Sequence, residues 1–324
     1  MELDKKDRKL LYLLDINARM SLTELSKKLR IPKATVSFRM ERLIKKGFVK
    51  RWITVIDVSR MGMYYFKIFF KFHRTNAELD KQIERFFVEH PAVPQVLHFQ
   101  GKYDYLVFFM VRHFEDLTSY MDELKRKFGE YILEKEIHVV TSIHRFNLRF
   151  MYPEGISKHT VYRAYPSLKS SLKIDETDLK ILTLLEQNAR MTCTEIAKQL
   201  KISPNTIRRK IKIFEKNKVI LGYNLSIDYE KFGLQWYHLA FELRDNKIIN
   251  KLFSYFNNKN QTVFGSTMLG KYDLSIEILV KNLKELKESL DGMKEKFGDD
   301  INQMDVLLIT KEPKMVWFPE APRP

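Results

Sequence analysis

The feature of this sequence that most constrains its fold is an internal repeat of about 170 residues. The run Asn17-Ala18-Arg19-Met20 recurs 171 residues later as Asn188-Ala189-Arg190-Met191. The run Gly101-Lys102-Tyr103-Asp104 recurs as Gly270-Lys271-Tyr272-Asp273, at a shift of 169. A period this long exceeds that of a solenoid, so the repeat predicts a duplicated pair of domains.

The first part of each copy has the pattern of a winged helix-turn-helix unit. Apolar residues recur at helical spacing over residues 4–16, 21–29 and 33–46, and residues 48–58 alternate as a β-wing would. Ser21 with Glu24, and Thr192 with Glu195 in the second copy, have the spacing of a capping box. In the second copy Ser203-Pro204 opens the third helix, and Lys218 replaces the Gly47 that ends it in the first.

The second part of each copy predicts a ferredoxin-like domain with the order β-α-β-β-α-β. In the first copy the six elements are expected at residues 65–72, 77–90, 93–100, 105–111, 114–128 and 133–143. In the second copy they are expected at residues 236–243, 247–257, 261–269, 274–280, 283–297 and 303–310.

The fold class is therefore α+β, with two winged helix-turn-helix domains alternating with two ferredoxin-like domains. The boundaries are residues 1–60 and 61–147 for the first copy, 148–172 for a linker that matches nothing in either copy, and 173–232 and 233–324 for the second.

Charge favours an acidic partner, and double-stranded DNA is the one we expect. The formal net charge is +16 and the pI about 9.6. Residues 1–60 hold 16 Lys/Arg and 7 Asp/Glu, whereas residues 171–231 hold 12 and 8, so phosphate attraction is predicted to be stronger through the first unit. General solubility is the alternative explanation of the charge. No long apolar run or charged-then-apolar leader is visible, and Cys193 is the single cysteine, so we expect no membrane span and a cytoplasmic location.

The third helix of each unit is predicted to enter the major groove of DNA. Its outward positions are polar or basic, as base and phosphate contacts require. The predicted DNA-binding residues are Lys33, Thr35, Ser37, Arg39 and Arg42 in the first copy, and Asn205, Thr206, Arg208, Arg209 and Lys212 in the second. An ordinary solvated helix face is the alternative, and the same layout in two copies weakens it.

Taken together, these motifs resemble the Lrp/AsnC, or feast/famine, transcription regulators. The residues that carry the resemblance are those of the helix-turn-helix, such as Asn17-Ala18-Arg19 and Gly47-Phe48-Val49, and the Gly101-Lys102-Tyr103-Asp104 motif. The first and the last of these motifs are present twice. The resemblance implies a sequence-specific regulator that assembles as dimers or larger oligomers. It also implies that one chain pairs its own two sensor domains, as an internal pseudo-dimer.

The resemblance further implies small-molecule effectors, often amino acids, bound near the glycine-aspartate turns. The predicted effector-binding residues are Gly101, Tyr103, Asp104, Gly270, Tyr272 and Asp273. From the residues alone a plain hairpin turn is the better explanation, because glycine and aspartate are turn formers.

Two other functions stay open at this point. Sirohaem decarboxylases have a related fold, although the single His98 ahead of the first turn, with no counterpart in the second copy, does not suggest their tetrapyrrole contacts. An architectural protein that coats DNA with low specificity is the other alternative. No catalytic motif, cofactor motif or metal motif is recognisable, and His138 with His144 makes at most a weak metal pair. We therefore expect no enzyme.

Overall fold

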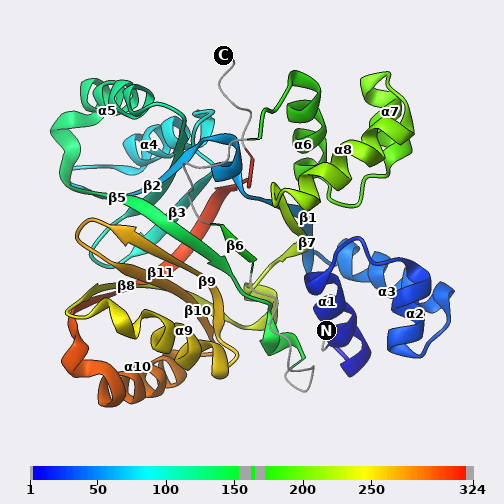
Figure 1. The fold of residues 1–324 in the computed structure, drawn as a ribbon. Helices are drawn as coiled ribbons and strands as arrows, with labels where there is room; N and C mark the ends of the chain where they lie inside the picture. The colour runs from blue at the N-terminus through cyan, green and yellow to red at the C-terminus, as the bar shows by residue number, and fades with distance from the viewer. Residues whose placement is uncertain (1–2, 153–161, 165–171, 319–324) are drawn as a thin grey trace.

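Two helical units lie on one side of a single β-barrel, with the N-terminal copy and the C-terminal copy contributing to both parts (Figure 1). This arrangement is that of a computed structural model, which describes residues 3–152, 162–164 and 172–318. Among the helices of these residues, none has the length and apolar character needed to cross a membrane.

Each copy begins with the three helices that the sequence predicts. α1 (Lys5–Ile16), α2 (Leu22–Leu29) and α3 (Lys33–Lys45) form the unit that we call the first reader, and α6 (Glu176–Gln187), α7 (Cys193–Leu200) and α8 (Pro204–Lys216) form the second reader. Both predicted capping boxes are present, at Ser21 with Glu24 and at Thr192 with Glu195. Side chains therefore satisfy amide groups that the first turn of each α2-type helix leaves without an intrahelical partner.

The strand that follows each reader pairs with the strand of the other reader. β1 (Val49–Ile56) and β7 (Ile220–Ile227) run antiparallel, with Trp52 opposite Leu225. The sequence predicts a separate wing in each unit, whereas the structure joins the two strands in one shared ribbon. Lys218 takes the left-handed conformation (φ 59°) that Gly47 takes in the first copy (φ 73°), so β7 forms without the glycine.

Both ferredoxin-like domains have the predicted β-α-β-β-α-β order, and we label them the first and second sensors after the family resemblance. The first contains β2 (Tyr64–Phe72), α4 (Ala77–Glu89), β3 (Gln95–Gln100), β4 (Tyr105–Val111), α5 (Phe114–Phe128) and β5 (Ile132–Arg145). The second contains β8 (Gln235–Leu243), α9 (Ile249–Asn258), β9 (Thr262–Leu269), β10 (Leu274–Val280), α10 (Leu283–Phe297) and β11 (Ile301–Met315).

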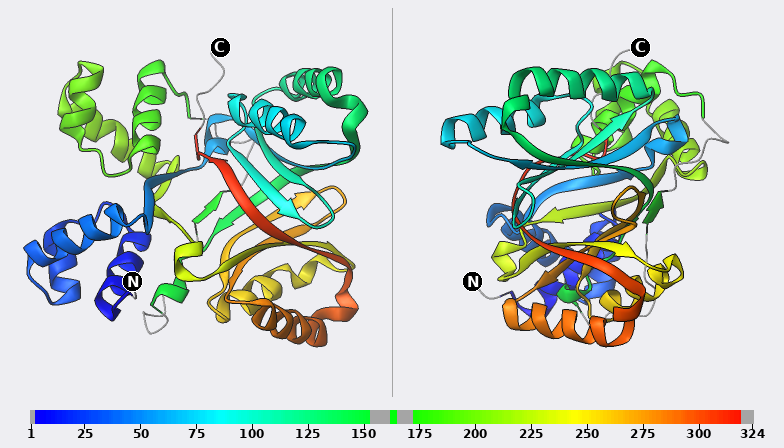
Figure 2. Two further views of the ribbon diagram at one scale, coloured as in Figure 1. Left: turned by 180° about the vertical axis from the view of Figure 1, so that it is seen from behind. Right: turned by 90° about the vertical axis from the view of Figure 1, so that its left-hand side faces the viewer.

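The two four-stranded sheets join edge to edge and close on themselves. Strands follow one another in the order β2-β4-β3-β11-β8-β10-β9-β5, and β5 pairs back onto β2. The closure depends on β5 and β11, because each pairs first with a strand of its own copy and then, in its second half, with a strand of the other copy. Figure 2 shows the helices α4, α5, α9 and α10 on the outside of this barrel.

The predicted linker is only partly described. β6 (Tyr162–Ala164) adds to the end of β5, and η3 (Arg149–Met151) begins after a gap of three residues from β5. The rest of the linker prediction, at residues 153–161 and 165–171, lies outside the described residues.

Candidate nucleic-acid interface and sensor turns

The shared ribbon fixes the two readers relative to each other, and a second set of contacts reinforces it. The Arg19 guanidinium donates to the Ala189 carbonyl oxygen (2.7 Å), and Arg190 donates to the carbonyl oxygen of Ala18. Each arginine also stacks on an aromatic ring of the ribbon, Arg19 on Tyr223 and Arg190 on Trp52. The repeated Asn-Ala-Arg motif therefore joins one reader to the other, and we call it the clasp.

The predicted DNA contacts of the second reader lie mainly on one exposed face of α8. Asn205, Arg208, Arg209 and Lys212 are exposed, and at spacings of three and four residues they share this face. The Arg208 guanidinium donates to Asn205 Oδ1 (2.7 Å). Thr206 is half-buried, and its amide donates to the Ser203 hydroxyl that caps the helix. Lys216, which the sequence pattern did not single out, extends the same face by one turn.

The predicted DNA contacts of the first reader separate into two groups. Lys33 is exposed and Thr35 and Ser37 are half-buried, but Arg39 and Arg42 turn toward α1. Arg39 lies 2.6 Å from an Asp4 oxygen and 2.7 Å from Asp7, and Arg42 lies 2.6 Å from Asp7. Hydrogen bonds to these carboxylates raise the pKa of the Arg39 guanidinium. Both arginines are thus engaged in holding α3 against α1.

The second copy repeats this support with a different cation. Lys210, which stands where the first copy has Arg39, lies 2.8 Å from Asp175 and 2.6 Å from Asp178. The equivalence shows that this position of the third helix faces the first helix in both readers. Sequence periodicity could not separate it from the DNA-facing positions, because a basic residue suits either environment.

The glycine-aspartate turns of the two sensors meet at the seam between the sheets. Gly101 (φ 140°) and Gly270 (φ 150°) take backbone conformations that favour glycine. A Cβ on Gly270 would lie 3.0 Å from the Ile137 carbonyl oxygen and 2.6 Å from His138, and one on Gly101 would lie 3.1 Å from Leu307. Each turn therefore approaches the last strand of the other copy closely.

The two aspartates of these turns accept hydrogen bonds from backbone amides. Asp104 accepts from the Phe72 amide and from the Lys71 ammonium, at 2.8 and 2.7 Å. Asp273 accepts from the Leu243 amide at 2.8 Å. Each carboxylate thus joins the turn to the first strand of its own sensor, which explains the fixed spacing of the repeated motif without a ligand.

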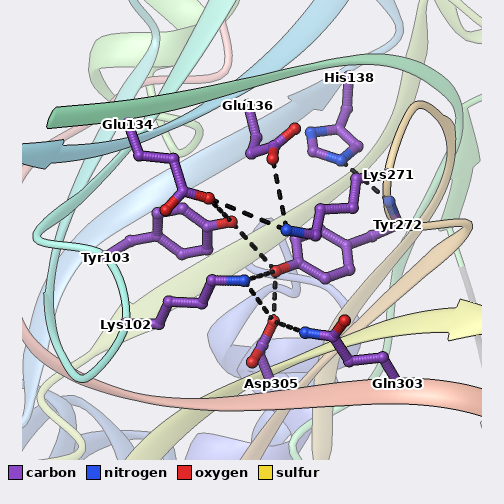
Figure 3. Close-up of polar contacts among 9 residues, drawn as sticks. All are labelled: Lys102, Tyr103, Glu134, Glu136, His138, Lys271, Tyr272, Gln303 and Asp305. Carbon is purple, nitrogen blue, oxygen red and sulfur yellow. Dashed lines mark hydrogen bonds and ion pairs between the residues drawn. The ribbon is translucent and has the colours of Figure 1, made fainter.

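The tyrosines and lysines of the turns form a polar cluster across the seam, shown in Figure 3. The hydroxyl oxygens of Tyr103 and Tyr272 lie 3.2 Å apart, and Tyr272 donates to Asp305. Lys102 lies 3.3 Å from Asp305, and Lys271 lies 3.4 Å from Glu136, so each lysine pairs with a carboxylate of the other copy. Burial raises the pKa of Tyr103 to about 12. The cluster is paired internally and joins the two sensors.

The polar partners that β5 and β11 contribute to this cluster are residues that the sequence did not lead us to expect. Glu134 and Glu136 alternate along β5, and Gln303 and Asp305 take the equivalent places on β11. This period-two spacing places the two polar side chains of each strand on the same face of the sheet, and it is the signal that was present.

A cavity of ≈ 420 Å³ lies between the ribbon and the barrel. Its wall includes Lys50 of β1, Leu225 of β7, Tyr229, Trp236 of β8, Arg145 of β5 and Glu312 of β11. Burial raises the pKa of the Glu312 carboxyl to about 7. The indole N–H of Trp236 has no hydrogen-bond partner among the described residues. The lining therefore combines both signs of charge with apolar and aromatic surface.

The two histidines considered as a metal pair are core residues. His138 accepts from the Tyr272 amide (3.1 Å) and stacks on that ring, and burial lowers its pKa to about 4. His144 Nε2 lies 2.9 Å from the Ser142 hydroxyl. Within the described part of the chain, no group of three or more His, Cys, Asp or Glu side chains is placed to hold a metal ion.

Known proteins match the readers in sequence. The family model for winged helix-turn-helix DNA-binding domains matches residues 3–50 and, again, residues 174–220. The HTH-type transcriptional regulator LrpA of Pyrococcus horikoshii is 43% identical over 60 residues, 18% of this chain and 43% of that protein. An uncharacterized HTH-type transcriptional regulator of Pyrococcus abyssi is 34% identical over 107 residues, which cover 32% of this chain and 71% of that protein. The chain belongs to the Lrp/AsnC family of transcriptional regulators.

This Lrp/AsnC regulator also has a whole-chain match among solved structures. The siroheme decarboxylase NirDL aligns with a TM-score of 0.65 over 97% of this chain and 93% of its own, at 14% sequence identity. At that identity the likeness shows a shared fold, with two readers and two sensors in one chain, and carries no activity with it.

Proposed function

We propose that this Lrp/AsnC regulator controls transcription by binding double-stranded DNA in a sequence-specific way through α3 and α8. The observation that carries the proposal is the shared ribbon with its clasp, which holds two recognition helices in one fixed geometry within a single chain. Helix-turn-helix dimers read two half-sites through such a fixed separation of their helices. The net charge of +16 supplies the sequence-independent attraction to phosphates.

The test is fluorescence anisotropy with the duplex upstream of the chain's own coding sequence and a scrambled duplex, at two salt concentrations. We expect at least ~1000-fold tighter binding to the natural duplex, weakening with salt. Equal, salt-sensitive binding to both duplexes would favour the architectural function instead. Absence of binding to either duplex would favour sirohaem decarboxylation instead. That function would be tested by the absorbance spectrum of the protein with an added tetrapyrrole.

A matched pair of variants tests the assignment of α8. Arg208→Ala with Arg209→Ala removes two charges from the proposed DNA face, whereas Lys284→Ala with Lys287→Ala removes two exposed charges from α10 on the barrel. We expect the first pair to weaken specific binding by about 1–3 kcal/mol for each base that an arginine no longer reads, and the second to leave it nearly unchanged. Equal effects would show that only net charge matters.

We also propose that a small effector binds in the cavity between the ribbon and the barrel. A ligand there would contact both the strands that carry the readers and the sensor strands, so it would favour one reader geometry over another. Because the lining offers the exposed Lys50 ammonium on the one hand and the Glu312 carboxyl on the other, an amino acid or similar small zwitterion fits its chemistry. The paired turns, which the family resemblance suggested, already use their polar atoms on each other.

The two effector locations are separable by experiment. The twenty amino acids would be screened by their shift of the melting temperature, and any hit retested on Glu312→Gln and on Tyr103→Phe. Loss of the shift in Glu312→Gln alone supports the cavity, and loss in Tyr103→Phe alone supports the turns. Association of two chains, also a prediction from the family, is measured by sedimentation velocity on the same samples.

A further inference from the structure

We propose that the two readers recognise half-sites of different sequence, so that one chain binds a non-palindromic operator in one orientation. This inference rests on the proposed DNA-binding function and adds what each reader recognises. The repeat aligns α3 with α8 residue by residue.

The two recognition helices are equivalent position by position. α3 and α8 each span 13 residues, and the shift of 171 residues aligns their first and last positions. Their buried residues coincide under this shift, because Val36 matches Ile207 and Leu43 matches Phe214. The faces that point away from the reader cores must therefore coincide as well.

The exposed faces have different chemistry. Where α8 presents Asn205, Arg208, Arg209 and Lys212, α3 presents Ala34, Ser37, Phe38 and Glu41. Phe38 is 64% exposed, although it is a large apolar residue on a helix with a core of its own. Ser37 donates to the Glu41 carboxylate (2.9 Å), which gives this face a negative end. These four positions carry a formal charge of +3 in α8 and −1 in α3.

Each set of side chains selects different bases in a major groove. Arginine donates to the O6 and N7 acceptors of guanine, and asparagine pairs with adenine. Alanine and phenylalanine contact the methyl group of thymine, and a glutamate accepts from the amino group of cytosine. The α8 half-site is therefore expected to contain guanine, and the α3 half-site to present a thymine methyl to Phe38 and a cytosine amino group to Glu41.

The first reader keeps its attraction to DNA through cations beside the recognition face. Lys27, Lys28, Arg30 and Lys33 are exposed on α2, on the turn and at the start of α3. The matching positions of the second reader are Lys198, Gln199, Lys201 and Pro204, which carry two fewer charges. The higher charge of the first unit thus serves phosphate contacts, while the second unit places its charge on the base-reading face.

Because both readers belong to one chain, the difference between the faces of α3 and α8 can specify an asymmetric operator. In a homodimer both recognition helices are identical, and the operator mirrors the twofold axis. Here the clasp and the β1–β7 ribbon hold α3 and α8 in one relative position, so the two unlike half-sites keep a fixed order and spacing.

The experiment is selection of bound sequences from a randomised duplex pool by the full chain. The wild type is expected to enrich two unlike half-sites. A quadruple variant, Ala34→Asn with Ser37→Arg, Phe38→Arg and Glu41→Lys, gives α3 the face of α8 and is expected to enrich an inverted repeat of the α8 half-site. Arg208→Ala with Arg209→Ala is expected to remove preference in one half-site only, by roughly 5- to 150-fold per guanine.

The outcomes distinguish failure of the unlike half-sites from failure of the proposed sequence-specific DNA binding. An inverted repeat enriched by the wild type would overturn the inference and leave sequence-specific DNA binding standing. No enrichment by any variant would overturn both. All changed side chains are exposed or half-buried, and melting curves of the variants that match the wild type exclude misfolding as the cause of any change.

Discussion

Asp15 connects the first reader to the barrel through a buried ion pair, and its removal tests how the two parts are held together. The carboxylate is 0% exposed and lies 2.6 Å from the Arg145 guanidinium, which is 3% exposed. It also accepts from the Leu148 amide at 2.8 Å. Asp15 belongs to α1, whereas Arg145 ends β5 of the first sensor and Leu148 lies just after it, so the contact crosses between domains.

Replacing Asp15 with asparagine keeps the shape and removes the charge. Breaking a buried pair from one side costs about 3–5 kcal/mol, because the remaining charge stays buried without compensation. We therefore expect Asp15→Asn to lower the free energy of unfolding by about that amount. The assay is urea unfolding followed by tryptophan fluorescence, since Trp52, Trp236 and Trp317 lie on the ribbon, on β8 and after β11.

A surface carboxylate provides the matched control. Glu288 is exposed and lies 4.0 Å from the exposed Lys284, so Glu288→Gln is expected to change stability by less than about 0.5 kcal/mol. Combining Asp15→Asn with Arg145→Met removes both charges, and the double variant is expected to be more stable than the sum of the two single effects implies. A decrease below about 1 kcal/mol for Asp15→Asn would refute the reasoning that this pair anchors the reader.

Three further predictions follow from backbone geometry and burial. Gly270→Ala is expected to lower the melting temperature more than Gly101→Ala, because its Cβ would meet a backbone oxygen at 3.0 Å, whereas that of Gly101 would meet the flexible Leu307 at 3.1 Å. Lys218→Gly is expected to stabilise the chain by about 0.5–1 kcal/mol in urea unfolding, since a left-handed non-glycine residue costs more than glycine's extra entropy. Burial lowers the pKa of Lys67 to about 8 from its ordinary 10.5, so its burial penalty is complete below pH 8 and is relieved as pH rises toward 10.5. Lys67→Met is expected to abolish that part of the rise in stability, measured as the difference between the two unfolding curves against pH.

Local elements were predictable because their signals lie within a few residues of one another. The strand at Tyr105–Val111 and the helices at Phe114–Phe128 and Leu283–Phe297 have the predicted bounds. The partners of strands were not predictable in this way. The tails of β5 and β11 were predicted too short, because residues beyond 143 and 310 continue as strand through pairing with the other copy and, for β5, also with β6. The ribbon was interpreted as two wings for the same reason.

The same distinction between local and distant contacts decides which site residues were predictable. The outward face of α8 followed from helical spacing alone. The role of Arg39 depends on Asp4 and Asp7, which come close only when α1 packs on α3, and a sequence offers no measure of that packing. The aspartates of the turns show the opposite case, since the ordinary properties of Gly and Asp in turns predicted the structural role that their hydrogen bonds to backbone amides show. Effector binding at these turns stays a prediction.

Duplication within one chain has a consequence that a dimer of separate chains does not share. Linking two partners makes their association intramolecular, so the pairing of readers and of sensors does not depend on protein concentration. Each copy then always pairs with the other copy, whose sequence differs from its own. A substitution in one copy is therefore not repeated in the other. The barrel shows this divergence as clearly as the readers do, because β5 carries Glu134, Glu136 and His138 where β11 carries Gln303, Asp305 and Leu307. The proposed asymmetric operator is consistent with a pseudo-dimer whose halves are free to specialise.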